Sequence, residues 1–580
     1  MRVIRPVTNA GIAQLLHEFA DLMDLRGDVF KRNAYRRAAR SVESLEQDIR
    51  QVMEEGWLDK VPGVGKSIAM KIREIVETGT SKELEGLRGS FPPGLAEMMR
   101  VPDVGPRTAA RLYRELGVAD LEMLRKAAME HRIRQLPGFG ERSETNILRG
   151  IDLVERQGSR MLLSIALLKG EELVEHVRSS GFPRASVAGS MRRMRETVGD
   201  VDLLVGTDRP GEAMEAFVSF PQVVSITVRG DSKTSVRLAD SIQADMRAVP
   251  EASYGAALQY FTGSKEHNVK LRRIAIGKGL RLNEYGLFDT AGVNLAAGRP
   301  EEGIYRMLDL QPVPPELRED RGEIEAAARG LLPRLVEQRD VRGDLHVHTV
   351  LSDGHGTMRE MAMAAMRRGY EYVGLTDHSA SLHIANGLDS NELLASVEQA
   401  RHLTEELNFP VMRGAEMEIL EDGSLDYPRE VLEQLDYVIA SVHTRFKMGI
   451  DEMTDRVIRA MRSGRVHILG HPTGRLLGRR EGYAIDMDAV MEEASKLGVA
   501  MEVNGYPDRL DLNDVNCRKA KEKSVMVVLN TDSHREGNLA NMRLAVGTAR
   551  RGWLGPENVL NCLPHHQLKA ALARKIAETI

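Results

Sequence analysis

Residues 189–205 have the sequence Gly-Ser-Met-Arg-Arg-Met-Arg-Glu-Thr-Val-Gly-Asp-Val-Asp-Leu-Leu-Val. The second half of this stretch, from Val198 to Val205, is rich in β-branched and apolar residues, which predicts a strand. Asp200 and Asp202 are two positions apart in it. Because side chains alternate along a strand, we expect both carboxylates on one face. Two neighbouring carboxylates repel each other unless a cation lies between them, so the stretch predicts a site for a hard divalent ion.

The first half of the same stretch is suited to phosphate. Gly189 and Ser190 offer flexible backbone and a hydroxyl, and Arg192 and Arg193 add guanidinium groups that can bind phosphate oxygens. A bare Asp-x-Asp pattern is more often a pair of surface aspartates on a solvated edge strand. Its combination with Gly-Ser-x-Arg-Arg favours phosphate chemistry assisted by metal ions.

The composition indicates a large protein with several folded domains. The chain has 580 residues, of which 42% are hydrophobic and 28% charged. Its net charge of −5 does not indicate a nucleic-acid-binding protein, although local patches decide binding. Cys517 and Cys562 are not spaced as metal ligands, which argues against a disulfide framework and for a cytoplasmic location. We find neither the apolar run of a signal peptide nor a membrane-spanning stretch of roughly 20 residues, so we expect no membrane partner.

The first quarter of the chain is predicted to be helical and basic in places. Helical periodicity covers residues 9–25 and 33–50. Between Arg26 and Arg40 there are six basic residues and one acidic residue, with Tyr35 among them. A charge run of this kind is usually a solvated helix face. The functional alternative is a pocket for a nucleic-acid phosphate.

A short repeat occurs three times in this region. The copies are Val61-Pro-Gly-Val-Gly65, Val101-Pro-Asp-Val-Gly105 and Leu136-Pro-Gly-Phe-Gly140, and a helical pattern follows each of them. The glycines allow a tight turn whose backbone N–H groups point toward a phosphate, as in a helix–hairpin–helix. A single copy is compatible with an ordinary turn, but three copies indicate a DNA-holding module. Because Asp103 and Glu141 depart from the pattern, we expect the second hairpin to be the weakest and the third to be structural.

Two motifs in this region match a known family. Asn33-Ala-Tyr-Arg-Arg-Ala-Ala39 and residues 61–72, with the sequence VPGVGKSIAMKI, resemble the small N-terminal domain of family X DNA polymerases, to which DNA polymerase beta belongs. The resemblance implies a domain that holds the 5′-phosphate across a short gap. The DNA-binding residues that the hairpins and the resemblance imply are Lys31, Tyr35, Gly63, Gly65, Lys66, Lys71, Gly105 and Arg107.

Lys71 carries a further implication of the resemblance. It aligns with the lysine that some family members use as a Schiff-base nucleophile in a deoxyribose-phosphate lyase reaction. Ser67 replaces a lysine that is often present in that pocket. The alternative for Lys71 is a solvated lysine on a helix surface.

The resemblance continues to residue 312 and implies roles for the opening stretch. Asp200 and Asp202 match two carboxylates that hold the catalytic metals, and Asp245 on a predicted neighbouring strand is the candidate for the third. Three carboxylates can hold two Mg²⁺ or Mn²⁺ ions, one near the primer 3′-hydroxyl and one on the triphosphate. Gln243 replaces an arginine of the family.

The nucleotide-binding residues are also implied by the resemblance. Ser190 and Arg193 match residues that bind the incoming triphosphate, and Tyr260-Phe-Thr-Gly-Ser264 resembles a turn that faces the sugar. Without the Thr-Gly-Ser sequence, a buried aromatic pair would be the preferred interpretation of this turn. The implied nucleotide-binding residues are Gly189, Ser190, Arg193, Tyr260, Phe261, Gly263, Asn268 and Arg272.

The last 240 residues differ in composition from the rest. Twelve of the sixteen histidines lie after residue 340. Histidines and acidic residues follow one apolar run after another, with helical patterns between them, which predicts a β/α barrel whose active site lies at the carboxyl ends of its strands. A lone histidine is more often a satisfied core residue than a metal ligand, but nine such groups favour metal binding. They are His346, His348, Asp353, His378, Glu416, His443, His471, Asp532 and His534.

This region resembles the PHP (polymerase and histidinol phosphatase) domain. The resemblance implies an active hydrolase with up to three ions, Zn²⁺ and/or Mn²⁺. The implied ligand sets are His346, His348, Glu416 and Asp532, then Glu416, His443 and His471, then Asp353, His378 and His534. We assign no role to His383, His402, His467, His565 or His566, and we consider Arg445, Asn504 and Arg509 as candidate contacts to DNA phosphate.

The sequence therefore predicts a multidomain α and α/β protein. We expect helical helix–hairpin–helix domains, a polymerase-beta-like nucleotidyltransferase palm and a C-terminal PHP domain with a distorted β/α barrel. The expected divisions are a DNA-binding domain at 1–88, a fingers-like subdomain at 89–155, the palm at 156–250, a nucleotide-selecting subdomain at 251–312, a linker at 313–340 and the PHP domain at 341–580.

The predicted function is DNA repair, including base excision repair. We expect a monomer that binds gapped or primed DNA and deoxynucleoside triphosphates, fills gaps, and degrades DNA as a 3′-5′ exonuclease. In the family the second activity extends to incision at abasic sites and removal of 3′-phosphates. Two alternatives are a small-molecule phosphatase akin to histidinol phosphatase and a DNA-binding scaffold without catalysis.

Overall fold

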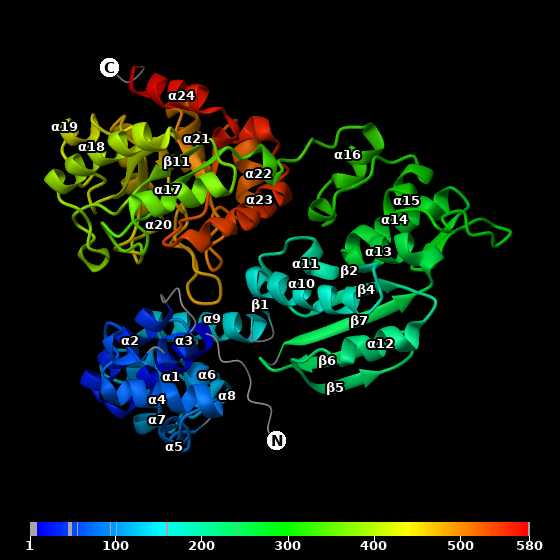
Figure 1. Cartoon of the computed structure of the whole chain (residues 1–580), viewed down its shortest axis with the longest axis horizontal. Helices are drawn as coiled ribbons and strands as arrows, with labels where there is room; N and C mark the ends of the chain where they lie inside the picture. Colours follow the sequence, from blue (N-terminus) through cyan, green and yellow to red (C-terminus); the bar gives the residue numbers. More distant parts are fainter. Residues whose placement is uncertain are drawn as a thin grey trace. The chain divides into compact units, whose positions relative to one another are not determined.

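The computed structural model describes residues 9–43, 49–54, 56–92, 94–99, 101–157, 160–240 and 242–577. The chain divides into two compact units (Figure 1), residues 1–159 with 478–480 and residues 160–477 with 481–580. Among the helices that the structure describes, none combines the length and apolar character that a membrane span requires.

The first unit is built from helices around one apolar core. Its α-helices are α1 (Asn9–Arg26), α2 (Val29–Glu43), α3 (Ile49–Glu54), α4 (Lys66–Thr78), α5 (Lys82–Arg88), α6 (Gly94–Met98), α7 (Pro106–Leu116), α8 (Leu121–Met129) and α9 (Glu141–Gln157). The core extends from Ile12 on α1 to Ile151 on α9, so the described helices on both sides of residue 88 share it. Burial of one apolar stripe per helix explains this packing.

The three repeats form hairpins with the same backbone conformation. The third residue of each copy has a positive φ: 77° at Gly63, 66° at Asp103 and 84° at Gly138. Helices α4, α7 and α9 begin immediately after the three copies. Aspartate tolerates the left-handed region better than most residues, so Asp103 does not prevent the second hairpin from forming.

The palm, residues 160–250, contains a five-stranded sheet. Its strand order is β2 (Ala185–Val187), β4 (Val201–Gly206), β7 (Gln243–Val249), β6 (Lys233–Leu238) and β5 (Val223–Arg229). Strands β4 and β7 are parallel and the other pairs are antiparallel. Helices α10 (Leu163–Ser179) and α12 (Pro210–Val218) pack against the sheet.

The predicted strand around the two aspartates is interrupted. Thr197–Val198 forms a short strand, β3, which pairs with β1 (Met161–Leu162), and β4 begins only at Val201. Asp200 therefore lies in the bend before β4, and our prediction that one strand carries both aspartates was wrong. Gly199 and Asp200 together form the bend between the two strands.

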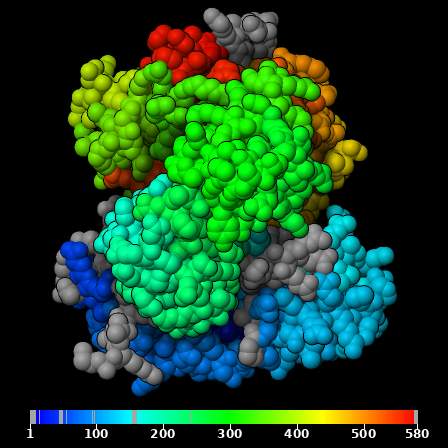
Figure 2. All heavy atoms as spheres, turned by 90° about the vertical axis from the view of Figure 1, so that its right-hand side faces the viewer, coloured from blue at the N-terminus to red at the C-terminus, as the bar shows by residue number. Residues whose placement is uncertain are grey.

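The second subdomain, residues 254–335, contains more helix than strand. Its elements are α13 (Tyr254–Thr262), α14 (Lys265–Gly277), β8 (Arg281–Asn283), β9 (Gly286–Phe288), α15 (Glu301–Met307) and α16 (Glu323–Arg329). Leu317, Ile324 and Leu335, which we expected in a linker, lie in its apolar core. Part of this segment is thus packed structure. In Figure 2 the bright green spheres, near residue 300 on the colour bar, lie together on the face shown.

The barrel, residues 341–577, has seven parallel strands in chain order. They are β10 (Gly343–Val347), β11 (Tyr372–Leu375), β12 (Val411–Glu418), β13 (Tyr437–Ser441), β14 (Ile468–Leu469), β15 (Ala500–Asn504) and β16 (Val527–Asn530). A parallel bridge between Val347 and Ser533 brings the first and last strands together.

Helices surround these strands (Figure 1). They are α17 (Met358–Arg367), α18 (Ser390–Leu407), α19 (Arg429–Leu432), α20 (Ile450–Arg462), α21 (Met487–Leu497), α22 (Asp514–Glu522), α23 (Met542–Arg551) and α24 (His565–Ala577). The strands are almost entirely buried, as expected for a parallel sheet covered by helices. The predicted β/α barrel and the mixed α and α/β fold class are confirmed.

Candidate active sites

The palm brings two of the predicted carboxylates onto adjacent strands. Asp202 on β4 pairs in register with Asp245 on β7, and Asp200 immediately precedes β4. Burial, and then the charges of Asp200 and Asp245, raise the pKa of Asp202 to about 7. Burial and the charge of Asp245 also raise the pKa of Asp200. Three oxygen-donor groups that destabilise one another's charges fit divalent cations, which would remove this repulsion.

Asp245 is held differently from its two neighbours. Its Oδ2 lies 2.9 Å from Lys233 Nζ, and its Oδ1 accepts a hydrogen bond from Gln243 Nε2 at 3.1 Å. Burial acts to raise its pKa, but these hydrogen bonds hold the pKa of Asp245 below its usual value. Gln243 therefore orients a predicted metal ligand.

The phosphate motif lies directly against Asp202. It forms a short helix, α11 (Gly189–Arg192), in which Gly189 has φ of 59°. A Cβ atom on Gly189 would overlap with Oδ2 of Asp202, so only glycine allows this approach. Ser190 follows on the same turn and is partly exposed.

Both arginines of the motif contact the second subdomain. Arg192 Nη1 donates to Thr262 Oγ1 at 2.6 Å and to Glu301 Oε2 at 2.9 Å. Arg193 Nη1 donates to the carbonyl of Thr262 at 2.6 Å, and its Nε donates to Glu319 Oε1 at 3.1 Å. The role of Arg193 in binding a triphosphate stays a prediction.

The remaining predicted nucleotide-binding residues gather at the carboxyl end of α13. The rings of Tyr260 and Phe261 are edge to face at 5.1 Å and partly buried. Asn268 Nδ2 donates to the carbonyl of Tyr260 at 2.7 Å, and Arg272 Nε donates to the carbonyl of Asn268 at 3.4 Å. Gly263 lies beside the guanidinium of Arg193, since a Cβ there would be 3.1 Å from Nη1. The turn is thus adjacent to the phosphate motif.

The first unit places the predicted DNA-binding residues on and around two hairpins. Gly65 immediately precedes α4, and Gly105 immediately precedes α7. Gly63 lies in the hairpin before α4. Lys31 and Lys66 are exposed. Arg107 is also exposed, with its Nε 3.5 Å from Asp24 Oδ1.

Lys71 and Tyr35 form a small buried cluster. Tyr35 is buried and stacks on Phe19 at 4.7 Å. Lys71 Nζ lies 5.9 Å from the centre of the Tyr35 ring, 2.9 Å from Glu83 Oε2 and 3.1 Å from Ser67 Oγ. Burial alone would lower the pKa of Lys71, but the hydrogen bond to Glu83 opposes this effect, and the pKa of Lys71 is raised. A Schiff-base reaction needs the neutral amine, so this contact opposes it, and the lyase role of Lys71 stays a prediction.

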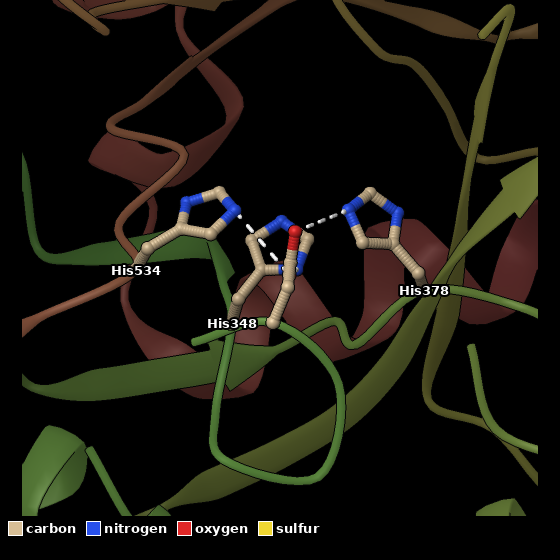
Figure 3. A group of neighbouring side chains, drawn as sticks. His348, His378 and His534 are labelled. Atoms are coloured by element: carbon tan, nitrogen blue, oxygen red, sulfur yellow. Dashed lines mark ion pairs between the residues drawn. The ribbon is translucent and has the colours of Figure 1, made fainter. Parts of the chain in front are cut away.

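The barrel collects the nine predicted metal ligands at the carboxyl ends of its strands. Three groups have ligand atoms that all lie within 4.8 Å of one another: His348, Asp353, His378 and His534; His346, His348 and Asp532; and His378, Glu416 and His443. Figure 3 shows His348, His378 and His534 converging. Two histidines approach Oε1 of Glu416. His471 Nε2 lies 2.8 Å from this oxygen, and His443 Nε2 lies 3.2 Å from it.

The chemistry of this cluster fits metal ions. His346 Nε2 and both ring nitrogens of His348 are buried without a hydrogen-bond partner. Burial, and then the charges of His534 and His378, lower the pKa of His348 to about 4, which favours the neutral imidazole that a metal ion requires. His378 differs. Burial alone would lower the pKa of His378, but the charge of Glu416 opposes this effect, and the pKa of His378 is raised to about 10. In such a site a metal ion replaces the proton between imidazole and carboxylate.

Two buried carboxylates behind the cluster were not predicted. Glu502 Oε1 accepts a hydrogen bond from His346 Nδ1 at 2.6 Å, and Glu418 Oε2 accepts one from His443 Nδ1 at 2.9 Å. Each bond turns the opposite nitrogen, Nε2, toward the cluster. Glu418 is two residues from Glu416 on β12, so the strand period could have identified it.

The other residues that we considered have different positions. Arg509 Nε lies 3.4 Å from Asp532 Oδ2, and Asn504 Nδ2 donates to the same atom at 3.1 Å. Arg445 is exposed and pairs with Glu421 at 3.0 Å. His467 is buried in the barrel wall, where its Nδ1 accepts a hydrogen bond from Val438 N.

Comparison with known proteins agrees with this architecture. Family models match a helix-hairpin-helix domain at residues 7–81, a SAM-like helix-hairpin-helix tandem at 95–152, a DNA polymerase beta thumb at 257–319 and a PHP domain at 344–504. The hairpins, the palm carboxylates and the histidine-rich barrel together define a class of protein, a beta-type DNA polymerase joined to a PHP domain.

The full-length relative is more specific. The chain is 39% identical over 568 residues to DNA polymerase/3′-5′ exonuclease PolX of Bacillus subtilis strain 168, which covers 97% of this chain and 99% of the relative. The chain therefore belongs to the PolX family of DNA polymerase/3′-5′ exonucleases.

The chain also resembles proteins along part of its length. It is 31% identical over 230 residues to a probable phosphatase of Syntrophotalea carbinolica, covering 38% of this chain and 90% of the relative. A probable phosphatase of Clostridium acetobutylicum is 32% identical over 213 residues, covering 34% of this chain and 81% of the relative.

Proposed function

We propose that this chain is a DNA repair enzyme that extends a 3′ end across a short gap and removes nucleotides from a 3′ end at a second site. The observation that carries the proposal is the presence, in one chain, of a carboxylate site in the palm and an imidazole-rich site in the barrel. The name of the Bacillus subtilis relative joins the same two activities. Gapped or primed DNA and deoxynucleoside triphosphates are the proposed substrates, and base excision repair is the proposed setting.

In the polymerase reaction the palm acts mainly by positioning. Asp200, Asp202 and Asp245 would hold Mg²⁺ or Mn²⁺, and Ser190 with Arg193 would bind the triphosphate. The turn of Tyr260 and Phe261 would face the sugar, with Gly189 and Gly263 allowing close approach. Asn268 and Arg272 would lie near the nascent base pair. The hairpins, with Lys66 and Arg107 at the helices that follow them and Lys31 on α2, would hold the DNA backbone without selecting its sequence.

In the nuclease reaction the barrel would hold up to three ions of Zn²⁺ and/or Mn²⁺. When bound, divalent ions supply Lewis acidity and stabilise negative charge on phosphate oxygens. His346, His348 and Asp532 would hold one ion and Asp353, His378 and His534 another. Glu416 would hold a third with His443 and His471. Incision at abasic sites and removal of 3′-phosphates would use the same phosphoester chemistry.

One observation favours a second candidate function for the barrel. The probable phosphatases match this chain over most of their own length. A small-molecule phosphatase would hydrolyse a free phosphomonoester and leave a single-stranded oligonucleotide intact. The three DNA-holding hairpins on the same chain favour the nuclease.

Separate variants test the two-site proposal. A labelled gapped duplex is incubated with Mg²⁺ or Mn²⁺, with and without deoxynucleotides. Asp200→Ala should abolish extension and retain degradation, whereas His346→Ala or Asp532→Ala should abolish degradation and retain extension. Loss of both activities in each variant would contradict two separate sites. Cleavage of a phosphomonoester without degradation of the oligonucleotide would support the phosphatase instead.

A further inference from the structure

Within the second unit, one arginine joins the palm to the nuclease site. Arg475 lies four residues after His471, and its side chain is 13% exposed. Its Nη2 donates to Glu196 Oε2 at 2.7 Å, and Glu196 belongs to the palm turn that links α11 to β3. The same guanidinium donates through Nε to the carbonyl of Arg509 at 3.0 Å and through Nη2 to the carbonyl of Leu510. Glu196 is thus connected by a single side chain to the backbone of Arg509.

Arg509 faces the proposed metal cluster. Its Nε lies 3.4 Å from Oδ2 of Asp532, and its side chain is 20% exposed. Among the described residues, the guanidinium of Arg509 donates no hydrogen bond, and Asp532 is its ion-pair partner. A guanidinium beside a metal-site carboxylate, with its outer nitrogens available, suits a phosphate oxygen of a DNA strand.

The loop that carries Arg509 is fixed on its palm side as well. Leu510, with φ of 43°, is 1% exposed and belongs to the apolar core of the palm. Asp511 Oδ2 accepts hydrogen bonds from Thr473 N and Oγ1, both at 2.9 Å. The loop therefore has the palm on one side and the nuclease cluster on the other. Arg475 holds it through hydrogen bonds to its backbone carbonyls.

We propose that the palm is a working part of the nuclease site: Glu196, through Arg475, positions Arg509 beside Asp532 to bind the phosphate of the strand being degraded. Glu196 and Arg475 are positioning residues, and Arg509 is the residue that contacts substrate. Arg475 is mostly buried, so the loss of Glu196 would leave its charge poorly compensated and would shift the loop it holds. A substitution in the polymerase half of the chain should then impair degradation.

Glu196→Gln in the full-length chain tests this inference. It keeps the shape of the side chain and removes the charge that holds Arg475. We expect the KM for 3′-5′ degradation of a labelled single-stranded oligonucleotide to rise about 2- to 30-fold, the range typical of energetic coupling between distant positions. The kcat and the content of bound metal should change little, because no proposed ligand is altered. Arg509→Gln should raise KM at least as much.

A double variant separates positioning from general destabilisation. Arg475→Gln, and the milder Arg475→Lys, should show the KM defect of Glu196→Gln. If the residues act through one contact, Glu196→Gln combined with Arg475→Gln should be no worse than the more affected single variant. Multiplication of the two defects would contradict a shared contact.

The matched control is Glu171→Gln. Glu171 and Arg543 also form an ion pair between palm and barrel, at 3.0 Å, but both are more exposed. Among the described residues, the side chains of this pair have no hydrogen bond or ion pair to the Arg509 loop. This variant should degrade DNA normally. Unchanged degradation in Glu196→Gln, an equal defect in Glu171→Gln, or loss of metal from Glu196→Gln would each overturn the inference. Failure of the nuclease proposal itself would appear as an inactive unaltered chain.

Discussion

Gly189 has no Cβ atom, and this allows the phosphate motif to lie directly against Asp202 on β4. Gly189→Ala would place Cβ against Oδ2 of Asp202 and would force an L-residue to adopt φ of 59°. We expect primer extension to fall about 100-fold, the size of effect that follows from misplacing reacting groups by roughly 1 Å. Degradation should persist. Gly199→Ala is the control, since a Cβ there meets only Arg160 Nη1, at 3.7 Å; an equal loss in both variants would contradict this explanation.

Glu502 is expected to act on metal affinity. It is fully buried, accepts a hydrogen bond from His346 Nδ1 and also accepts one from His471 N at 2.7 Å. Glu502→Gln keeps the shape but weakens the carboxylate–imidazole contact, so metal affinity in the barrel should fall about 10- to 100-fold. Metal retained against a graded chelator measures this directly. Glu398→Gln, at an exposed barrel position, should retain metal normally, and so should Glu502→Gln if the contact is unimportant.

The palm carboxylates predict a pH dependence of stability in metal-free protein. The pKa of Asp202 is about 7 in the folded chain, against 3.8 for an ordinary aspartate. The unfolded chain therefore loses this proton first, and the folded state is progressively destabilised as pH rises from about 4 to 7. Asp202→Asn should raise the melting temperature at pH 8 and have little effect near pH 4. A gain at pH 4 as large as that at pH 8 would argue against charge repulsion as the cause.

At the scale of elements, the two ends of α4 separate DNA binding from backbone strain. Gly63 and Gly79 have φ of 77° and 81°, so an alanine at either position costs about 1–2 kcal/mol. Only Gly63 lies in the hairpin that precedes the helix. We expect both alanine variants to lower the melting temperature. If the hairpin donates a hydrogen bond to a phosphate, only Gly63→Ala should also weaken binding to a gapped duplex, by about tenfold. Fluorescence anisotropy measures the binding. Equal affinities of the two variants for the duplex would show that this hairpin does not contact the DNA.

The same scale shows what the sequence could predict. The barrel strands and the polar residues that gather at their ends were predictable, because an apolar run followed by a polar side chain marks the carboxyl end of a parallel strand. The bend at Asp200 was not, because the residues around it have strand propensity and only Gly199 interrupts them. Glu502 was also missed, since its partner His346 is 156 residues away and no local pattern joins them. The core positions of Leu317 and Ile324 depend in the same way on tertiary packing.

At the scale of the whole molecule, two sites with different ligand chemistry should respond differently to metal. The palm site offers only carboxylates, which suit Mg²⁺, whereas the barrel cluster is rich in imidazole, which suits Zn²⁺. After chelation and removal of the chelator, Mg²⁺ alone should restore primer extension and leave degradation low. Addition of Zn²⁺ or Mn²⁺ should then restore degradation. The His346→Ala chain should regain extension with Mg²⁺ and gain no degradation from either later ion. Full recovery of degradation with Mg²⁺ alone would show that ligand type does not distinguish the two centres.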